Sequence, residues 1–326
     1  MLFRCVNLPL RAIVAAAALV AAVECAAQAY PSKPVRVVVP ASPGGGSDLV
    51  ARIVAAPLGN MLGQPFVVEN RVTAGGVIGS QQVAQSAPDG YTLLVTFDTF
   101  VTNQFLFKNL QWSPVKDFAS VMQICRFPQV LLVHPGVGVK NLQEFVALAK
   151  KNGAELNYGT AGQGSSSRLA YELFKSFANI ETVAIHYKGG GPAIQDLIAG
   201  QVQVMLVQGG GAIQQSLKAG KLHVLAVSTP VRSALYPGVP AIAETYPGFD
   251  SQSWVGMFAP AAAPKEIIDK LNASLVKVLA DPAMKERFDS QAAEIVAGAP
   301  EALARVVLAD QAKWGKIVRD IKISLD

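Results

Sequence analysis

The residues best suited to bind a small charged molecule lie near the N-terminus, in a glycine-rich segment that follows a run of β-branched residues. The segment after Pro40 reads Ala41-Ser42-Pro43-Gly44-Gly45-Gly46-Ser47-Asp48. Its order predicts a strand over Val35–Val39, a tight loop and then a helix, with Ser47 or Asp48 as the N-cap. Glycine lets a ligand approach the loop backbone closely, and free N–H groups at a helix start favour an anion such as a carboxylate. The alternative is an ordinary connection between a strand and a helix.

A second glycine-rich segment repeats this arrangement in the middle of the chain. The run Leu156–Gly159 is typical of a strand, and a helical pattern covers Ser166–Phe177. The segment between them reads Ala161-Gly162-Gln163-Gly164-Ser165. A third such loop, Tyr187–Pro192, again separates a predicted strand from a predicted helix. Because the carboxyl ends of the strands form the ligand-binding edge of an open α/β sheet, we expect these loops to converge.

The second segment is also the one place that suggests a nucleotide. Gly162 and Gly164 match the first two glycines of the dinucleotide fingerprint G-x-G-x-x-G, but the third glycine is missing. The sequence therefore disfavours a nucleotide ligand.

Residues with the spacing of a catalytic or metal site are missing from the sequence. His134, His186 and His223 are the only histidines, and none has metal-ligand spacing. The nucleophile-elbow, zinc-protease and P-loop patterns are absent as well. His186, at a strand end, is either a pocket residue or, as is more common, a structural one. The sequence predicts a binding protein rather than an enzyme, with no cofactor and no metal.

Charge and targeting signals limit the partners and the location. The formal net charge of +5 comes from scattered lysines and arginines, without the basic run and interleaved aromatics of a nucleic-acid site. Two arginines, an apolar run and the ending Ala27-Gln28-Ala29 predict a secretory signal peptide over 1–29, cleaved before Tyr30. A lipoprotein modified at Cys25 is the alternative. After cleavage Cys125 is the only thiol, so the core must hold the fold without an internal disulfide.

The remaining chain, of roughly 300 residues, is long enough for two domains and alternates short apolar runs with helical patterns. This alternation predicts the α/β class with mainly parallel sheets that are covered on both faces. The predicted strands are Val35–Val39, Phe66–Glu69, Thr92–Thr96, Val130–His134, Leu156–Gly159, Thr182–Tyr187, Val202–Val207 and Leu222–Ser228. The predicted helices include Leu142–Lys151, Ser166–Phe177, Ala193–Ala199, Ile213–Ala219, Lys265–Leu279, Pro282–Gln291 and Pro300–Val318. The helix after the first glycine loop is expected to end or kink near Ala56, because Pro57 follows.

Further motifs occur in a fixed order along the chain. Besides the two glycine loops they are Tyr30-Pro31-Ser32-Lys33-Pro34, Gly63-Gln64-Pro65-Phe66-Val67-Val68-Glu69-Asn70-Arg71, Ala74-Gly75-Gly76-Val77-Ile78-Gly79, Ala87-Pro88-Asp89-Gly90-Tyr91-Thr92-Leu93, Asn157-Tyr158, Tyr187-Lys188-Gly189, Trp254-Val255-Gly256 and Ala259-Pro260. With these motifs the sequence resembles the Bug family, the periplasmic solute receptors of tripartite tricarboxylate transporters. The resemblance extends from about Tyr30 to the last predicted helix.

This resemblance implies a type II periplasmic-binding-protein fold, in which two α/β domains surround a ligand cleft and two strands cross between them. Domain I would consist of 30–129 and 255–326, and domain II of 130–254. The ligand carboxylate would be held between the first loop, Ser42 to Asp48, and the second, Ala161 to Ser165, often through bridging waters. Closure around the ligand would allow docking on membrane permease subunits. We expect a monomer.

Departures from the family pattern concern the ligand. Ala41 stands where an aromatic residue is usual, which predicts a wider pocket. The loop Thr96-Phe97-Asp98-Thr99 replaces a small hydroxylic one. Thr99 and Asp98 are therefore candidate ligand contacts. The Asp98 carboxylate either attracts a ligand donor such as an ammonium or is a turn or cap residue.

Two more departures lie in the second half of the chain. Val207-Gln208 replaces an Asp-Asn pair, which exchanges a polar acceptor for an apolar wall and makes Gln208 a candidate contact. Arg168 stands where histidine is common. It either pairs with a second carboxylate bidentately or lies solvated on its helix.

The leading hypothesis is a periplasmic receptor that captures a small carboxylate-bearing organic acid for a tripartite tricarboxylate transporter. A dicarboxylate, an aromatic acid and an amino acid all fit this description. The alternative is a ligand-sensing receptor that presents its bound form to a sensor kinase.

Overall fold

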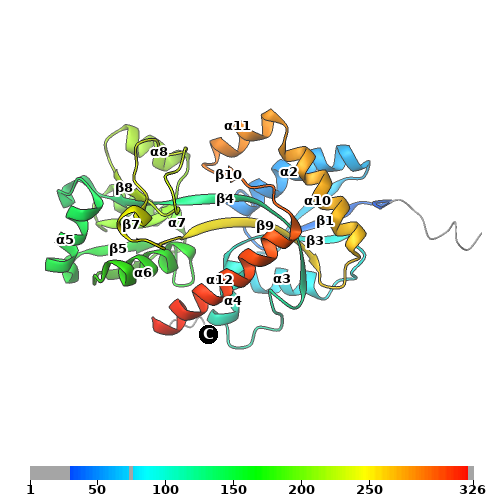
Figure 1. Ribbon diagram of the computed structural model, residues 1–326, viewed down its shortest axis with the longest axis horizontal. Helices are drawn as coiled ribbons and strands as arrows, with labels where there is room; N and C mark the ends of the chain where they lie inside the picture. The colour runs from blue at the N-terminus through cyan, green and yellow to red at the C-terminus, as the bar shows by residue number, and fades with distance from the viewer. Residues whose placement is uncertain (1–29, 73–75, 322–326) are drawn as a thin grey trace, which may run out of the picture.

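The computed structural model describes residues 30–72 and 76–321, so the expected signal peptide lies outside the described residues. Two lobes lie side by side and are joined by long strands that run from one to the other (Figure 1). Each lobe contains a sheet with helices packed against it, and the predicted α/β class is confirmed.

The first lobe is built on parallel strands in the order β2 (Phe66–Asn70), β1 (Val35–Val39) and β3 (Thr92–Phe97). Valine-rich β1 has four of its five residues buried, as expected for a strand covered on both faces. The helices of this lobe are α2 (Gly46–Leu62), α3 (Val77–Ala84), α4 (Thr99–Leu106), α10 (Lys265–Leu279) and α11 (Pro282–Ser290).

The second lobe repeats the pattern with β6 (Val183–His186), β5 (Asn157–Thr160) and β7 (Val204–Gln208), which are parallel neighbours. An additional strand, β8 (His223–Val227), pairs with β4. The helices of this lobe are α5 (Leu142–Asn152), α6 (Ser166–Ala178), α7 (Gly190–Ile198), α8 (Gly211–Lys218) and α9 (Ile242–Thr245), with short 3-10 turns at Pro135–Val137 and Gly153–Glu155.

Two long antiparallel strands connect the lobes. β4 (Phe118–Val133) pairs with β9 (Gln252–Pro260) in a register that runs from Phe118 opposite Pro260 to Pro128 opposite Gln252. From Gln129 onward β4 pairs instead with β7, and then also with β8. The long strands link the sheets of the two lobes and run antiparallel to their neighbours. The strands that are followed by helices are parallel to each other within each lobe, so the pairing as a whole is mixed.

The last helix, α12 (Pro300–Asp320), belongs to both lobes. Its residues Leu303 and Val307 pack in a cluster with first-lobe residues such as Leu94 and Phe100. Farther along, Trp314, Ile317 and Val318 pack in the core of the second lobe. In Figure 1 this helix lies diagonally beside β4 and β9, along the connection between the lobes.

Cys125 lies at the centre of the long strand β4, opposite Val255 of β9, and is fully buried in the first-lobe core. Burial raises the pKa of its thiol well above the ordinary value. Among the described residues it is a free cysteine, which fits the expectation that hydrophobic packing holds the fold.

Several sequence-based boundaries were wrong. Helix α2 runs through Pro57 to Leu62 instead of ending near Ala56. Pro57 removes one N–H donor, but Val54 and Leu58 on either side are fully buried, and their packing holds the helix through the defect. Elements without a place among the predicted strands and helices are β9, the first part of β4, the helices α3 and α4, and a two-residue strand, β10 (Glu294–Ile295), which lies between the helices predicted at Pro282–Gln291 and Pro300–Val318.

Within the described ranges, no helix combines the length and apolar character that crossing a membrane requires.

Candidate functional site

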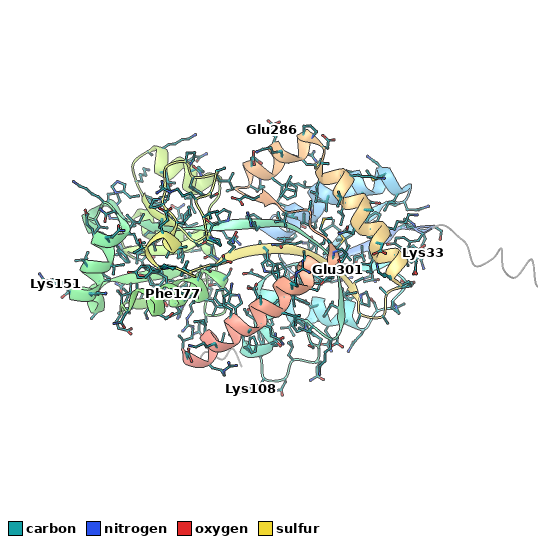
Figure 2. The ribbon with its side chains drawn as sticks, in the orientation of Figure 1. Lys33, Lys108, Lys151, Phe177, Glu286 and Glu301 are labelled. Carbon is teal, nitrogen blue, oxygen red and sulfur yellow. The ribbon has the colours of Figure 1, made fainter. Side chains whose placement is uncertain are left out.

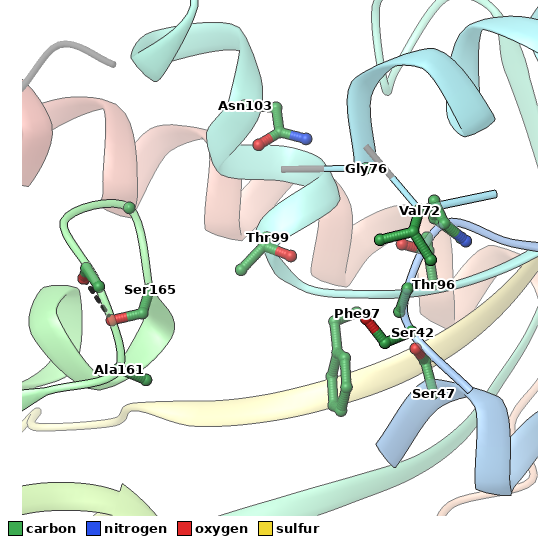
Figure 3. A pocket seen from close by; sticks show the side chains of 14 residues that line it. Ser42, Ser47, Val72, Gly76, Thr96, Phe97, Thr99, Asn103, Ala161 and Ser165 are labelled. Atoms are coloured by element: carbon green, nitrogen blue, oxygen red, sulfur yellow. Dashed lines mark hydrogen bonds between the residues drawn. The ribbon is translucent and has the colours of Figure 1, made fainter. Parts of the chain in front are cut away.

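A cavity of about 450 Å³ lies where loops of the two lobes face each other (Figure 3). It receives residues from the loops that follow β1, β2 and β5, from the end of β3 and from the N-terminal parts of α2 and α4. The lining residues are Pro40, Ala41, Ser42, Ser47, Val72, Gly76, Thr96, Phe97, Thr99, Asn103, Ala161, Gly162, Gly164 and Ser165. Of the three glycine loops, the first two therefore line one cavity.

The start of α2 forms one wall. The helix begins at Gly46, earlier than predicted, and its N-cap residue Gly45 has no side chain that could cap it. The first N–H groups of a helix have no acceptor within the helix. Because Ser47 in this first turn lines the cavity, these N–H groups lie beside it and can bind an anion.

The Asp48 carboxylate does not line the cavity; it holds the loop in place instead. It accepts hydrogen bonds from the Gly44 N–H at 2.9 Å, from Arg52 Nε at 3.0 Å and from Asn70 Nδ2 at 2.9 Å. Burial alone would raise the pKa of Asp48, but the hydrogen bonds from Arg52, Gly44 and Asn70 outweigh it and lower the pKa. The prediction that Ser47 or Asp48 is the N-cap is therefore wrong, because Gly45 holds that position, and Asp48 lies outside the lining.

Other residues of the first loop also lie outside the lining. Pro43 and Gly44 are exposed, and neither they nor Gly45 and Gly46 line the cavity. They shape the loop: the Gly45 N–H donates to the Ser42 carbonyl at 3.0 Å and closes a tight turn.

The start of α6 forms the facing wall. Ser165 is its N-cap, and its Oγ accepts from the Arg168 N–H at 3.4 Å and donates to the Gly162 carbonyl at 2.7 Å. Ser167 Oγ accepts from the Ala161 N–H at 3.0 Å. Of the five candidates in this loop, Gln163 alone does not line the cavity, and its side chain is exposed.

The third wall comes from the end of β3 and from α4. Thr96 and Phe97 end the strand, and Thr99 and Asn103 lie one turn apart on the helix. Of these four residues only Thr99 was a candidate from the sequence, and Asn103 was not recognised. The spacing of four residues between them is a signal that could have found it, because such residues share one face of a helix.

Asp98 lies between two lining residues but does not line the cavity. It is only 3% exposed, and its Oδ1 has no hydrogen-bond partner among the described residues. Burial raises the pKa of Asp98, the negative charge of Asp310 raises it further, and the result is a pKa of about 8. Lys313 and the hydrogen bonds from the Thr99 N–H and the Ser253 hydroxyl act in the opposite direction but are weaker. The structure therefore places the Asp98 carboxyl in the interior, away from the lining where the sequence-based prediction expected it.

Arg168 and Gln208 also lie elsewhere. Arg168 points its Nη1 at the Gln163 carbonyl, 3.3 Å away, and lines a separate groove with Glu172 and Lys175. Gln208 ends β7 opposite Gln129 of β4 and is not among the lining residues.

The third glycine loop does not line the cavity either. Its Gly189 N–H donates to the Ala161 carbonyl at 3.0 Å, so it supports the second loop from behind. His186 lies on the surface, where its Nδ1 is 2.8 Å from Thr160 Oγ1.

Among the described residues, no acidic or basic side chain lines the cavity. Charged groups lie elsewhere: Figure 2 shows Lys33, Lys108, Lys151 and Glu286 at the periphery of the molecule. In the described part of the chain, no cluster of His, Cys, Asp and Glu side chains has the arrangement of a metal site. The cavity thus offers backbone N–H groups, hydroxyls, one amide and an apolar ring, which can bind a small polar molecule.

Comparison with known proteins gives a consistent result. The family described as "Tripartite tricarboxylate transporter family receptor" matches residues 50–323. The chain is 33% identical to the protein BugT of Bordetella pertussis over 297 residues, which cover 90% of this chain and 91% of BugT.

Solved structures agree with the family match. A protein of R. palustris with adipate is 32% identical with a TM-score of 0.79, and the match covers 91% of this chain and 100% of that one. MatC from Rhodopseudomonas palustris with bound malate is 34% identical with a TM-score of 0.75, and the match covers 89% of this chain and 100% of MatC. The similar structures are solute-binding proteins with two α/β domains, which confirms the predicted fold class and the prediction of a receptor rather than an enzyme.

Proposed function

The chain belongs to the family of tripartite tricarboxylate transporter receptors, and we propose that it captures a small organic acid in the periplasm and delivers it to the permease subunits of such a transporter. The proposal includes removal of the signal peptide 1–29 and action as a monomer. It also includes two domains: domain I consists of 30–129 and 255–326, and domain II consists of 130–254. The change of strand partners at Gln129 of β4 supports that division.

One observation carries the proposal: two helix starts, one from each lobe, border the same cavity. The first turn of α2 and the capped start of α6 both direct the positive end of a helix dipole toward this region. Since no lysine or arginine is among the described residues of the lining, helix ends such as these are a source of positive potential for a carboxylate. The two structures with bound adipate and malate contain ligands of this chemical class.

Delivery requires that the transporter distinguish the loaded receptor from the empty one. The loops that line the cavity belong to different lobes, so a ligand that contacts both favours their approach. The closed form would then present a surface to the permease that the open form lacks.

The first experiment is a thermal-shift screen of residues 30–326 against mono- and dicarboxylates, aromatic acids and amino acids. Binding stabilises the folded form by about 2.7 kcal/mol at a ligand concentration of 100 Kd. We therefore expect acids of one chemical class to raise the melting temperature by several degrees.

A matched pair of variants tests the cavity itself. Ala161→Leu places a larger side chain in the lining and should abolish the shift, whereas Ala283→Leu, on the exposed face of α11, should preserve it. An unchanged shift in Ala161→Leu, or no shift from any acid with wild-type protein freed of copurified ligand by refolding, would contradict the proposal.

A further inference from the structure

We propose that the ring of Phe97 determines which acids bind, by favouring a ligand whose carbon body carries few hydroxyl groups. This inference rests on the proposed function and assigns a specificity role to one residue of the same cavity.

Phe97 lies where the carbon skeleton of a bound ligand would contact the wall of the cavity. It is the last residue of β3 and is half-buried, with part of its ring lining the cavity. In Figure 3 the ring is seen between the second glycine loop, at Ala161 and Ser165, and the first, at Ser42 and Ser47. A ligand that contacts both loops therefore lies along this ring.

The ring is held in place from two sides. A Cβ added to Gly46, the first residue of α2, would lie 2.8 Å from Phe97 Cζ, so the ring packs directly against the helix start. On the other side lies Phe127 of β4, whose ring centroid is 5.7 Å away at an interplanar angle of 51°. These two contacts limit where the ring can lie, and the missing side chain of Gly46 leaves room for it.

A ring held on two sides has a definite chemical preference. Its surface offers neither a hydrogen-bond donor nor a strong acceptor, and Ala41, Pro40 and Val72 extend the apolar lining. A methylene group placed here leaves water favourably, whereas a hydroxyl group loses its hydrogen bonds to water without replacement. The serines of the two glycine loops can bind the ends of the ligand, and Thr96, Thr99 and Asn103 add polar groups on the third wall. The part of the ligand that lies on the Phe97 ring therefore meets a surface without hydrogen-bonding groups.

The test compares acids that share a carbon skeleton and differ only in hydroxyl groups. Suitable pairs are succinate and tartrate, adipate and galactarate, and benzoate and 3,4,5-trihydroxybenzoate. With residues 30–326, isothermal titration should show that the unhydroxylated member of each binding pair binds at least about tenfold more tightly, which corresponds to about 1.4 kcal/mol.

Variants at position 97 locate the cause of the preference. Phe97→Ser should weaken binding of the unhydroxylated acid about tenfold or more and reduce the preference to near unity, whereas Phe97→Leu should retain a preference. Val231→Ser removes an apolar side chain that is 71% exposed and outside the cavity, so it should change neither affinity. Melting temperatures without ligand show whether each variant is folded.

The outcomes separate the two proposals. Tighter binding of the hydroxylated acids, or a preference that survives in folded Phe97→Ser, overturns the role of Phe97 and leaves the receptor function intact. Failure of every acid in the thermal-shift screen overturns the receptor function, and the role of Phe97 with it.

Discussion

The Asp98 carboxyl is a titratable group that the fold encloses almost completely. The charged groups around it are Asp310 and Lys313 of α12, and the polar groups are the Thr99 N–H and the Ser253 hydroxyl. Of these only Lys313 is positively charged, and burial together with Asp310 outweighs it. The neutral, protonated form is therefore the favoured one up to about pH 8.

Stability should consequently fall as the pH rises. The pKa of Asp98 is 3.8 ordinarily and about 8 in the folded protein, so between these values the folded protein keeps a proton that the unfolded chain has lost. The stabilising contribution is complete below about pH 4 and is lost by about pH 8, at about 1.4 kcal/mol per pH unit. Urea unfolding at intervals from pH 5 to pH 9 measures this slope.

Asp98→Asn provides the matched control because the amide resembles the neutral acid in shape and does not titrate. The difference in the free energy of unfolding between wild type and Asp98→Asn should shift with pH in the direction given above. Parallel pH profiles for the two proteins would show that Asp98 titrates at its ordinary pKa.

For single residues, the sequence predicted which ones lie near the cavity better than it predicted which way their side chains point. Ser47, Gly162 and Ser165 follow strands at helix starts, and that placement alone brings them to the cavity. Asp98 lies in the right loop too, but its side chain points into the protein, toward Ser253. Which way one side chain turns depends on long-range neighbours such as Asp310, and no local pattern contains them.

A buried hydrogen bond between Trp254 and Asp310 connects strand β9 to helix α12. Trp254 Nε1 on β9 donates to Asp310 Oδ2 on α12 over 2.8 Å, and both residues are buried. Lys313 Nζ, 3.0 Å from Asp310 Oδ1, provides the positive charge that a buried carboxylate needs. The contact holds α12 against the strands that connect the lobes.

Removing this donor should destabilise the protein measurably. Trp254→Phe keeps most of the ring and deletes the N–H, so we expect a loss of about 1.5–3 kcal/mol, the range for a hydrogen bond to a charged group. Trp112→Phe is a matched control, because Trp112 Nε1 donates to the neutral Val77 carbonyl at 3.0 Å and should cost only about 0.5–1.5 kcal/mol. Chemical unfolding of both variants measures the difference, and equal losses would contradict a special role for the carboxylate.

At the element scale, prediction succeeded where strand and helix signals are local. The helices α10, α11 and α12 begin near prolines or a capping Asp281 and were placed within a few residues. The long strand β4 was recognised only from Val130, because its first half includes Ser120, Gln123 and Arg126 and has no clean alternation. Its strand character comes from pairing with β9, more than a hundred residues later in the chain.

At the scale of the whole molecule, three elements tie the two lobes together. β4, β9 and α12 all pass between the lobes, and α12 contributes residues to the cores of both. Bending of the two strands near Gln129, where β4 changes partners, would change the cavity while both cores stay packed.

Ligand binding should therefore make the molecule more compact. Small-angle X-ray scattering of residues 30–326 with a saturating acid from the screen should give a smaller radius of gyration than without it. Ala161→Leu should give the same radius with and without the acid. An identical radius for wild type in both conditions would show that binding occurs without closure.

The position of Cys125 has a practical consequence. From Tyr30 onward it is the sole thiol, and in the folded protein it is buried and carries a raised pKa, so maleimide dyes will not modify it. Two cysteines introduced at exposed sites, one at Val276 on α10 and one at Val183 on β6, can thus be labelled with a fluorophore pair without first removing a native thiol. The natural scaffold already suits conversion into a fluorescent biosensor for whichever acid it binds.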